Sequence, residues 1–141
     1  MAHAFTVGVE EEFQIVDPST WELRSHVSEL LASSAEVFGD HIKRELHQSI
    51  VEVGTKICSG VDELAEEIIR SRRGLADAAE RVGLRVAAAG THPFSNWIDQ
   101  VLSPGERYQN IVEEMGQLAR SLLIFGLHVH VAVPDLSLIH I

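Results

Sequence analysis

The chain has 141 residues, of which 45% are hydrophobic, so it is long and apolar enough to form one domain with a buried core. Eleven Lys and Arg stand against 21 Asp and Glu, and a formal net charge of −10 excludes sequence-independent attraction to nucleic acid or to a membrane surface. The single cysteine, Cys58, excludes an internal disulfide framework. Without a signal peptide or an apolar run of about 18 residues, we expect a cytoplasmic protein.

The first part of the chain predicts a strand, a turn and a helix. Residues 5–17 have the composition of a strand, and the turn at 17–20 is expected to lead into a short partner strand over 21–24. Apolar residues at helical spacing predict a helix over 27–38, and Gly39 is a residue typical of a helix C-terminus.

The remainder predicts further strands separated by helices. β-branched residues favour a second long strand over 43–58, and apolar periodicity predicts a long helix over 60–82. A short strand is predicted over 84–91. A capping box at 103–106, with Pro at the first helical position, predicts a helix to about residue 123.

The elements alternate without a repeat or a low-complexity linker. We therefore expect residues 1–135 to be part of one domain, with a sheet covered by helices on one face. Residues 136–141 are apolar and too short for a helix that could bury itself. We interpret them as an atypical tail that results from truncation, and the chain as the N-terminal part of a longer protein with an unfinished sheet.

Alternation along the first strand places two carboxylates on one face. Glu10 and Glu12 share a face with Gly8 and Gln14, whereas Glu11 points to the opposite, apolar face. Two carboxylates roughly 6 to 7 Å apart on one face repel each other unless water or a cation lies between them. The face is therefore either exposed to solvent or a metal site.

A strand predicted over 126–133 adds two histidines. His128 and His130 share one face with the small residues Gly126 and Ala132, and the opposite face is entirely apolar. A single histidine there would more often be a core residue, but a pair with small neighbours favours a functional site.

Glu52 is the third acidic position, because it lies between apolar residues in the middle of a predicted strand. A carboxylate in such a strand must be paired, hydrogen-bonded or metal-bound. If three strands bring Glu10, Glu12, Glu52 and His128 onto one surface, oxygen ligands outnumber nitrogen, and this favours Mg²⁺ or Mn²⁺ over zinc.

Four segments carry a resemblance to a known family. They are FTVGVEEEFQIVDP at 5–18, QSIVEV at 48–53, GTHPF at 90–94 and GLHVHV at 126–131. In this order and spacing they resemble the N-terminal part of the glutamate-cysteine ligase type 2, or carboxylate-amine ligase, family. The resemblance extends to Asp135, whereas the final six residues do not resemble the family's continuation.

The resemblance implies an α+β fold: the curved, antiparallel-rich sheet of a glutamine synthetase-like catalytic domain, incomplete here, with helices on its outer face. It also implies an ATP-dependent ligase that makes γ-glutamylcysteine through a γ-glutamyl phosphate, a reaction of glutathione biosynthesis. Mg²⁺ or Mn²⁺ would be the cofactor. The substrates would be ATP, glutamate or another carboxylate, and cysteine or another amine.

The resemblance also implies roles for individual residues. Glu12 and Glu52 would bind one metal ion, and Glu10 and His128 would bind a second. His130 would lie near the nucleotide phosphate. Two further residues would border the amino-acid pocket, namely Thr91 and His92.

Two other interpretations remain open at this point. His128 and His130 could bind zinc in a metallohydrolase, with His92 as a further ligand and His47 only if it faced inward. Alternatively, the fragment is non-catalytic and pairs its sheet edge with a second copy, as a homo-oligomer. Because family members are much longer, we expect the 141-residue chain alone to be inactive as a ligase.

Overall fold

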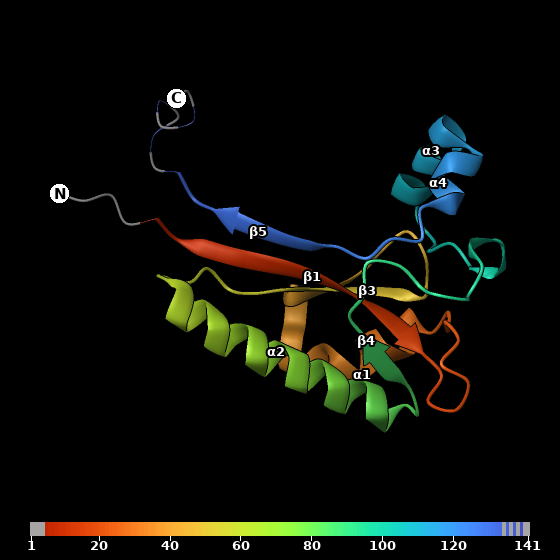
Figure 1. The fold of residues 1–141 in the computed structure, drawn as a ribbon, viewed down its shortest axis with the longest axis horizontal. Helices are drawn as coiled ribbons and strands as arrows, with labels where there is room; N and C mark the ends of the chain where they lie inside the picture. The colour runs from red at the N-terminus through yellow and green to blue at the C-terminus, as the bar shows by residue number, and fades with distance from the viewer. Residues whose placement is uncertain (1–4, 134, 136, 138, 140–141) are drawn as a thin grey trace.

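The computed structural model describes residues 5–133 together with residues 135, 137 and 139. The predicted tail, residues 136–141, falls largely outside this description. In Figure 1 the two long helices lie on one side of the strands, and two short helices lie together at one end. The elements are, in order, β1 (Val7–Val16), α1 (Val27–Phe38), η1 (Gly39–His41), β2 (Ile42–Arg44), β3 (Ile50–Gly54), α2 (Val61–Arg81), β4 (Arg85–Ala87), η2 (Trp97–Asp99), α3 (Glu106–Met115), α4 (Gln117–Ser121) and β5 (Leu127–Val131).

The strand β1 is the centre of a five-stranded antiparallel sheet. One edge of β1 pairs with β3, which in turn pairs with β2. The other edge is shared, because β5 pairs with residues 7–11 and β4 pairs with residues 14–16. β1 therefore lies between β3 on one side and β5 on the other (Figure 1).

The main core lies between the sheet and the helices α1 and α2. Alternate residues of β1 and β3, among them Phe13, Ile15 and Val51, are buried against Leu30 of α1 and Leu75 of α2. Burying such side chains removes apolar area from water and holds the helices on this face. The opposite face of the sheet is left for the carboxylates and histidines.

The predicted α+β fold class is confirmed: the sheet is antiparallel, it does not close, and helices cover one face. The helices predicted over 27–38 and 60–82 are present, and the first of them ends at Gly39 with a φ of 52°. Within the described residues, no helix is long and apolar enough to cross a membrane.

Several predicted element boundaries were wrong. The long strand expected over 43–58 is two short strands, β2 and β3, joined by the turn at 45–49. The capping box does not form, because the helix begins after Gly105 and breaks again at Gly116, where φ is 59°. Segment 84–91 contains only the three-residue strand β4. The partner strand expected over 21–24 is reduced to a single bridge.

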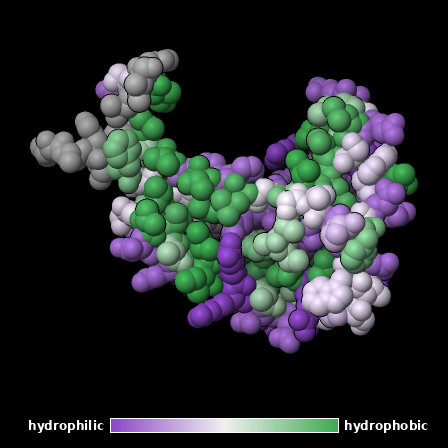
Figure 2. All heavy atoms as spheres, viewed as in Figure 1, coloured by the Kyte–Doolittle hydropathy of each residue, from purple (hydrophilic) through white to green (hydrophobic). Residues whose placement is uncertain are grey.

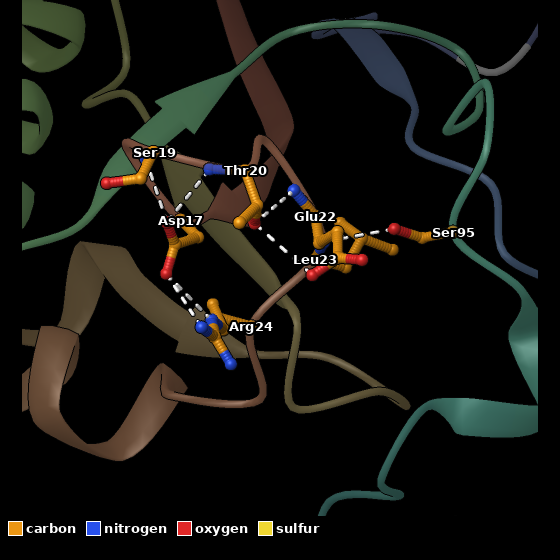
Figure 3. A network of polar contacts seen from close by, with 7 residues as sticks. All are labelled: Asp17, Ser19, Thr20, Glu22, Leu23, Arg24 and Ser95. Carbon is orange, nitrogen blue, oxygen red and sulfur yellow. Dashed lines mark hydrogen bonds and ion pairs between the residues drawn. The ribbon is translucent and has the colours of Figure 1, made fainter.

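The turn after β1 is organised by Asp17 (Figure 3). Its carboxylate accepts hydrogen bonds from the backbone N–H groups of Ser19 and Thr20, at 2.8 and 3.1 Å. Arg24 donates two further bonds to the other oxygen, and the pKa of Asp17 is lowered to about 2 by Arg24 first and then by the two backbone bonds. The bond from Leu23 N–H to Ser95 Oγ ties this turn to the 90s loop.

Candidate metal centre

The register of the sheet brings the predicted acidic and histidine side chains to one face. Glu12 lies directly opposite Glu52 across the β1–β3 pair, and Glu10 lies directly opposite His128 across the β1–β5 pair. Residues directly opposite each other in an antiparallel pair share a face of the sheet. The two pairs that the family resemblance implies as ligands of two metal ions are therefore cross-strand neighbours.

Three carboxylates come together beside these strands. Glu12, Glu45 and Glu52 each offer an oxygen, and these oxygens lie within 4.8 Å of one another. Glu45 follows β2 directly, at the start of the turn into β3, so it reaches the same place from a third part of the chain. Oxygens gathered this closely are typical of ligands for a hard divalent cation such as Mg²⁺ or Mn²⁺.

Glu45 was missed by the sequence interpretation. A single long strand over 43–58 would have placed it seven residues before Glu52, on the opposite face by parity. The turn at 45–49 folds β2 back against β3, and this reversal returns Glu45 to the Glu52 side. In the sequence, Glu45 and Glu52 flank the polar segment Gln48-Ser49. This pattern indicates a shared site only if the chain turns between the two glutamates.

The pKa of Glu52 is raised above its ordinary value. Burial is the largest cause, and the negative charges of Glu10 and Glu45 add to it, whereas Lys43 and His128 act in the opposite direction. Lys43 is the cross-strand neighbour of Glu52, with its Nζ 3.7 Å from a carboxylate oxygen. Glu52 is thus held partly buried beside other negative charges, a condition that a bound cation would relieve.

Gly126 allows His128 and Glu12 to approach each other. The backbone N–H of Gly126 donates a 2.6 Å hydrogen bond to Glu12 Oε2. A Cβ atom at this position would lie only 3.1 Å from His128 Nε2 and 3.4 Å from the same Glu12 oxygen. The space above Gly126 is therefore shared by the imidazole and the carboxylate, and a side chain here would push them apart.

His130 and Glu10 form a contact at the more open side of the site. The His130 ring nitrogen Nε2 lies 3.1 Å from Glu10 Oε2, and the imidazole remains exposed. His130 faces Gly8 across the strand pair, so no side chain separates it from the surface of β1. Its predicted place beside a phosphate remains a prediction.

Two hollows flank the three carboxylates. One, of about 550 Å³, is lined by Glu10, Glu45 and Glu52 together with the cationic side chains of Lys43 and Arg107. The other, of about 280 Å³, is lined by Glu12, Glu45, His128 and a set of apolar residues, namely Leu46, Ile50, Leu122, Ile124 and Phe125. The carboxylates therefore lie between a polar hollow and a more apolar one.

Glu11 takes no part in this face, as its parity predicts. It is buried on the helix side, where Arg72 of α2 donates to both of its oxygens. The pairing satisfies a carboxylate that would otherwise be costly to bury, and it raises the pKa of Arg72. Of the three consecutive glutamates, Glu10 and Glu12 therefore belong to the site, and Glu11 lies on the opposite face, where it binds α2.

Thr91 and His92, which were predicted to border an amino-acid pocket, form their hydrogen bonds with backbone groups and not with the carboxylates of the site. Thr91 donates its hydroxyl to the carbonyl of Leu123 and bridges Ile124, which lines the smaller hollow beside Glu12. His92 is buried, and its Nδ1 accepts from the Ser95 N–H while its Nε2 donates to the Trp21 carbonyl. The His92 ring thus has both nitrogens engaged with backbone.

The zinc interpretation loses its further histidine ligands. His92 has both ring nitrogens occupied, and His47 is buried with Nε2 directed at the Arg120 carbonyl. Burial also lowers the pKa of His47. Within the described residues, the group of three close potential ligands is composed of carboxylates, and this composition favours Mg²⁺ or Mn²⁺ over zinc.

Comparison with known proteins agrees with this reading of the motifs. The family model described as glutamate-cysteine ligase family 2 matches residues 6–137. A protein of Herpetosiphon aurantiacus named "Putative glutamate--cysteine ligase 2" is 52% identical over 131 residues, which are 93% of this chain and 34% of that protein. Proteins of the same name from Sorangium cellulosum and Solibacter usitatus are 50% and 44% identical over 133 residues each, or 36% and 34% of their lengths.

The chain spans about a third of the length of these curated relatives. The match nevertheless covers all the strands of the sheet and every carboxylate and histidine of the site. This chain belongs to glutamate-cysteine ligase family 2.

Proposed function

We propose that this chain carries part of the catalytic surface of an ATP-dependent carbon–nitrogen ligase that forms γ-glutamylcysteine from glutamate and cysteine. The observation that carries the proposal is the meeting of Glu12, Glu45 and Glu52 within 4.8 Å, in a chain of this family. Glu10 and His128, cross-strand neighbours on the same face, supply a second pair of ligands.

The site fits a pair of divalent cations by the chemistry of its side chains. Glu12, Glu45 and Glu52 would hold one Mg²⁺ or Mn²⁺, and Glu10 with His128 would hold the other. The raised pKa of Glu52 and the close carboxylates support this, because a cation would offset their mutual repulsion. Bound divalent ions would supply charge neutralisation and alignment of the phosphates.

The proposed reaction proceeds in two steps. An oxygen of the glutamate γ-carboxylate attacks the γ-phosphorus of ATP, ADP leaves, and γ-glutamyl phosphate forms. The amino nitrogen of cysteine then attacks the acyl carbon, so that the amide bond forms and phosphate leaves, with loss of a proton from nitrogen. Both steps bring anions together, so positive groups on this face matter most.

The chain's own cations and polar groups would serve these phosphates. Lys43 and Arg107 line the larger hollow next to Glu10 and Glu52, which suits the approach of a polyphosphate. His130, in contact with Glu10, would lie at the nucleotide phosphate. Thr91, next to the smaller hollow, would border the amino-acid substrate, and His92 would hold the loop that carries it.

Metal binding by the purified chain tests the site directly. We expect Mn²⁺ to bind, as followed by electron paramagnetic resonance, and Glu52→Gln or Glu12→Gln to weaken binding by at least about tenfold. The matched control is Glu36→Gln, an exposed glutamate of α1, which should leave the affinity unchanged. Equal Mn²⁺ affinity in all four proteins would contradict the proposed centre.

The reaction itself is tested in a longer chain. We propose a chimera in which this chain replaces the 131 matched residues of the Herpetosiphon aurantiacus relative. ADP release should depend on glutamate and cysteine, and a panel of other carboxylates and amines would reveal a different preference. Glu52→Gln should abolish turnover and Glu36→Gln should not. Full activity of the Glu52→Gln chimera would exclude the assigned role.

A further inference from the structure

The turn that carries Glu45 lies outside the strand pairing that fixes the other two carboxylates. Glu12 and Glu52 are paired with each other in the β1–β3 ladder. The β2–β3 ladder, by contrast, ends with the pair Arg44 and Val51, so Glu45 begins the unpaired turn. The position of the third carboxylate therefore depends on contacts that the sheet does not supply.

Residues 101–120, which include α3 and α4, supply such contacts. Gln48 of the turn donates its backbone N–H to the Val101 carbonyl at 2.8 Å, and its side-chain amide to the Leu102 carbonyl at 3.0 Å. In Figure 1, α3 and α4 lie apart from α1 and α2, and Figure 2 shows this end of the molecule as a projecting lobe. The turn is thus tied to a segment that lies 54 residues further along the chain.

Two buried side chains hold the backbone on either side of Glu45. Tyr108 of α3 is 9% exposed, and its hydroxyl donates a 2.7 Å hydrogen bond to the carbonyl of Arg44, the residue before Glu45. His47, two residues after Glu45, is 1% exposed, and its Nε2 donates to the Arg120 carbonyl at 3.1 Å. Because the peptide unit is planar, the bond to the Arg44 carbonyl also restrains the Cα atom of Glu45.

The carboxylate of Glu45 follows the backbone of its own turn. Its Oε2 accepts the backbone N–H of Leu46 at 3.1 Å, so the side chain is oriented by the adjacent peptide. Tyr108 lines the same hollow as Glu45 and Glu52, beside the place where the carboxylates meet. A shift of this turn would therefore move the Glu45 oxygens away from those of Glu12 and Glu52.

We propose that Tyr108 and His47 are positioning residues for Glu45, an assignment that rests on the metal centre proposed above. Through these two side chains the α3–α4 segment sets the geometry of the three carboxylates, although neither side chain would itself bind the ion. Residues that orient metal ligands typically change metal affinity by about 10- to 100-fold when they are replaced.

Tyr108→Phe in the 141-residue chain tests the role of the hydroxyl, because it keeps the aromatic ring. We expect the Mn²⁺ affinity, followed by electron paramagnetic resonance, to fall about tenfold, with the circular dichroism spectrum unchanged. Ser34→Ala is the matched control, since the buried Ser34 hydroxyl also donates a 2.7 Å bond to a backbone carbonyl, that of Leu30 in α1. This control should bind Mn²⁺ as the wild type does. A Tyr108→Phe chain with wild-type affinity would overturn the proposal.

A double-variant cycle separates positioning from a general effect on the fold. Glu45→Gln should itself weaken Mn²⁺ binding at least about tenfold, and adding Tyr108→Phe should cause no further loss, because the hydroxyl acts through the Glu45 carboxylate. A second tenfold loss in the double variant would show that Tyr108 acts by another route, and the assignment would be wrong.

The donor at position 47 is tested by a pair of substitutions. His47→Gln keeps a side-chain N–H that can reach the Arg120 carbonyl and should bind Mn²⁺ nearly as tightly as the wild type, whereas His47→Leu should bind about tenfold more weakly. Equal affinities of these two variants would contradict the role of His47.

Failure of the metal centre and failure of the positioning role give different results. A wild-type chain that binds no Mn²⁺ would remove the centre and the positioning role with it. A wild-type chain that binds Mn²⁺, and loses affinity with Glu45→Gln but not with Tyr108→Phe, would overturn the positioning role alone.

Discussion

At the scale of single residues, Gly126 shows how a missing side chain shapes the site. An added Cβ would lie 3.1 Å from His128 Nε2, closer than ordinary contacts, with Glu12 on the other side. Because His128 is exposed and can move, we expect Gly126→Ala to displace its ring and to weaken Mn²⁺ binding, with little effect on stability. Gly90→Ala, where a Cβ would meet nothing within 4 Å, is the control. Equal Mn²⁺ affinity of the two variants, followed by electron paramagnetic resonance, would contradict this role of Gly126.

Asp17 is a residue whose charge should contribute to the acid sensitivity of the chain. Its pKa is lowered to about 2 by Arg24 and the backbone N–H groups of Ser19 and Thr20. A carboxyl with a depressed folded pKa stabilises the folded state above its unfolded pKa near 4, and the contribution is lost as pH falls toward 2. Asp17→Asn should therefore lower the melting temperature at pH 7, and the difference from wild type should shrink as the pH falls from 4 to 2. A constant difference over that range would contradict the assignment.

At the scale of elements, the apolar contact between α2 and β1 includes one ion pair on the buried face, between Arg72 and Glu11. Arg72→Met would leave the Glu11 carboxylate buried without its partner, which we expect to cost about 2–3 kcal/mol at neutral pH. Adding Glu11→Leu should restore most of the loss, because the double variant buries no unpaired charge. Urea unfolding of the single and double variants checks this. If the double variant is as unstable as Arg72→Met, the loss does not arise from the unpaired carboxylate.

The elements also show what the sequence could and could not predict. Parity along β1 and β5 correctly separated Glu10 and Glu12 from Glu11 and placed His128 on their face, because strand alternation is a local property. The division of 43–58 into two strands was not predictable from β-branched content, since a polar turn at 45–49 interrupts it without Gly or Pro. Glu45 entered the site only through that turn.

Hydrogen bonds between residues that are distant in the sequence were also not predictable from the sequence. His92 looked available as a ligand, but its ring joins the Trp21 carbonyl to the Ser95 N–H, across 71 residues in one case. The capping box at 103–106 failed for a similar reason. Ser103 donates its backbone N–H to the Leu46 carbonyl instead of capping a helix, so tertiary contacts displaced a local preference.

At the scale of the whole molecule, the site is open, and this limits what the chain can do alone. His130 is 60% exposed at its side chain, and every residue of β5, including His128, is exposed. Phosphoryl transfer to a carboxylate needs an aligned and largely desolvated pair of anions, which an open surface does not provide. We therefore expect the 141-residue chain to bind Mn²⁺ but to release no ADP above background with ATP, glutamate and cysteine. The chimera with the longer relative, assayed under the same conditions, should release ADP, and Glu36→Gln should not change its rate. Robust γ-glutamylcysteine formation by the 141-residue chain would show that the described face is sufficient for catalysis, and that the rest of the family's polypeptide serves another purpose.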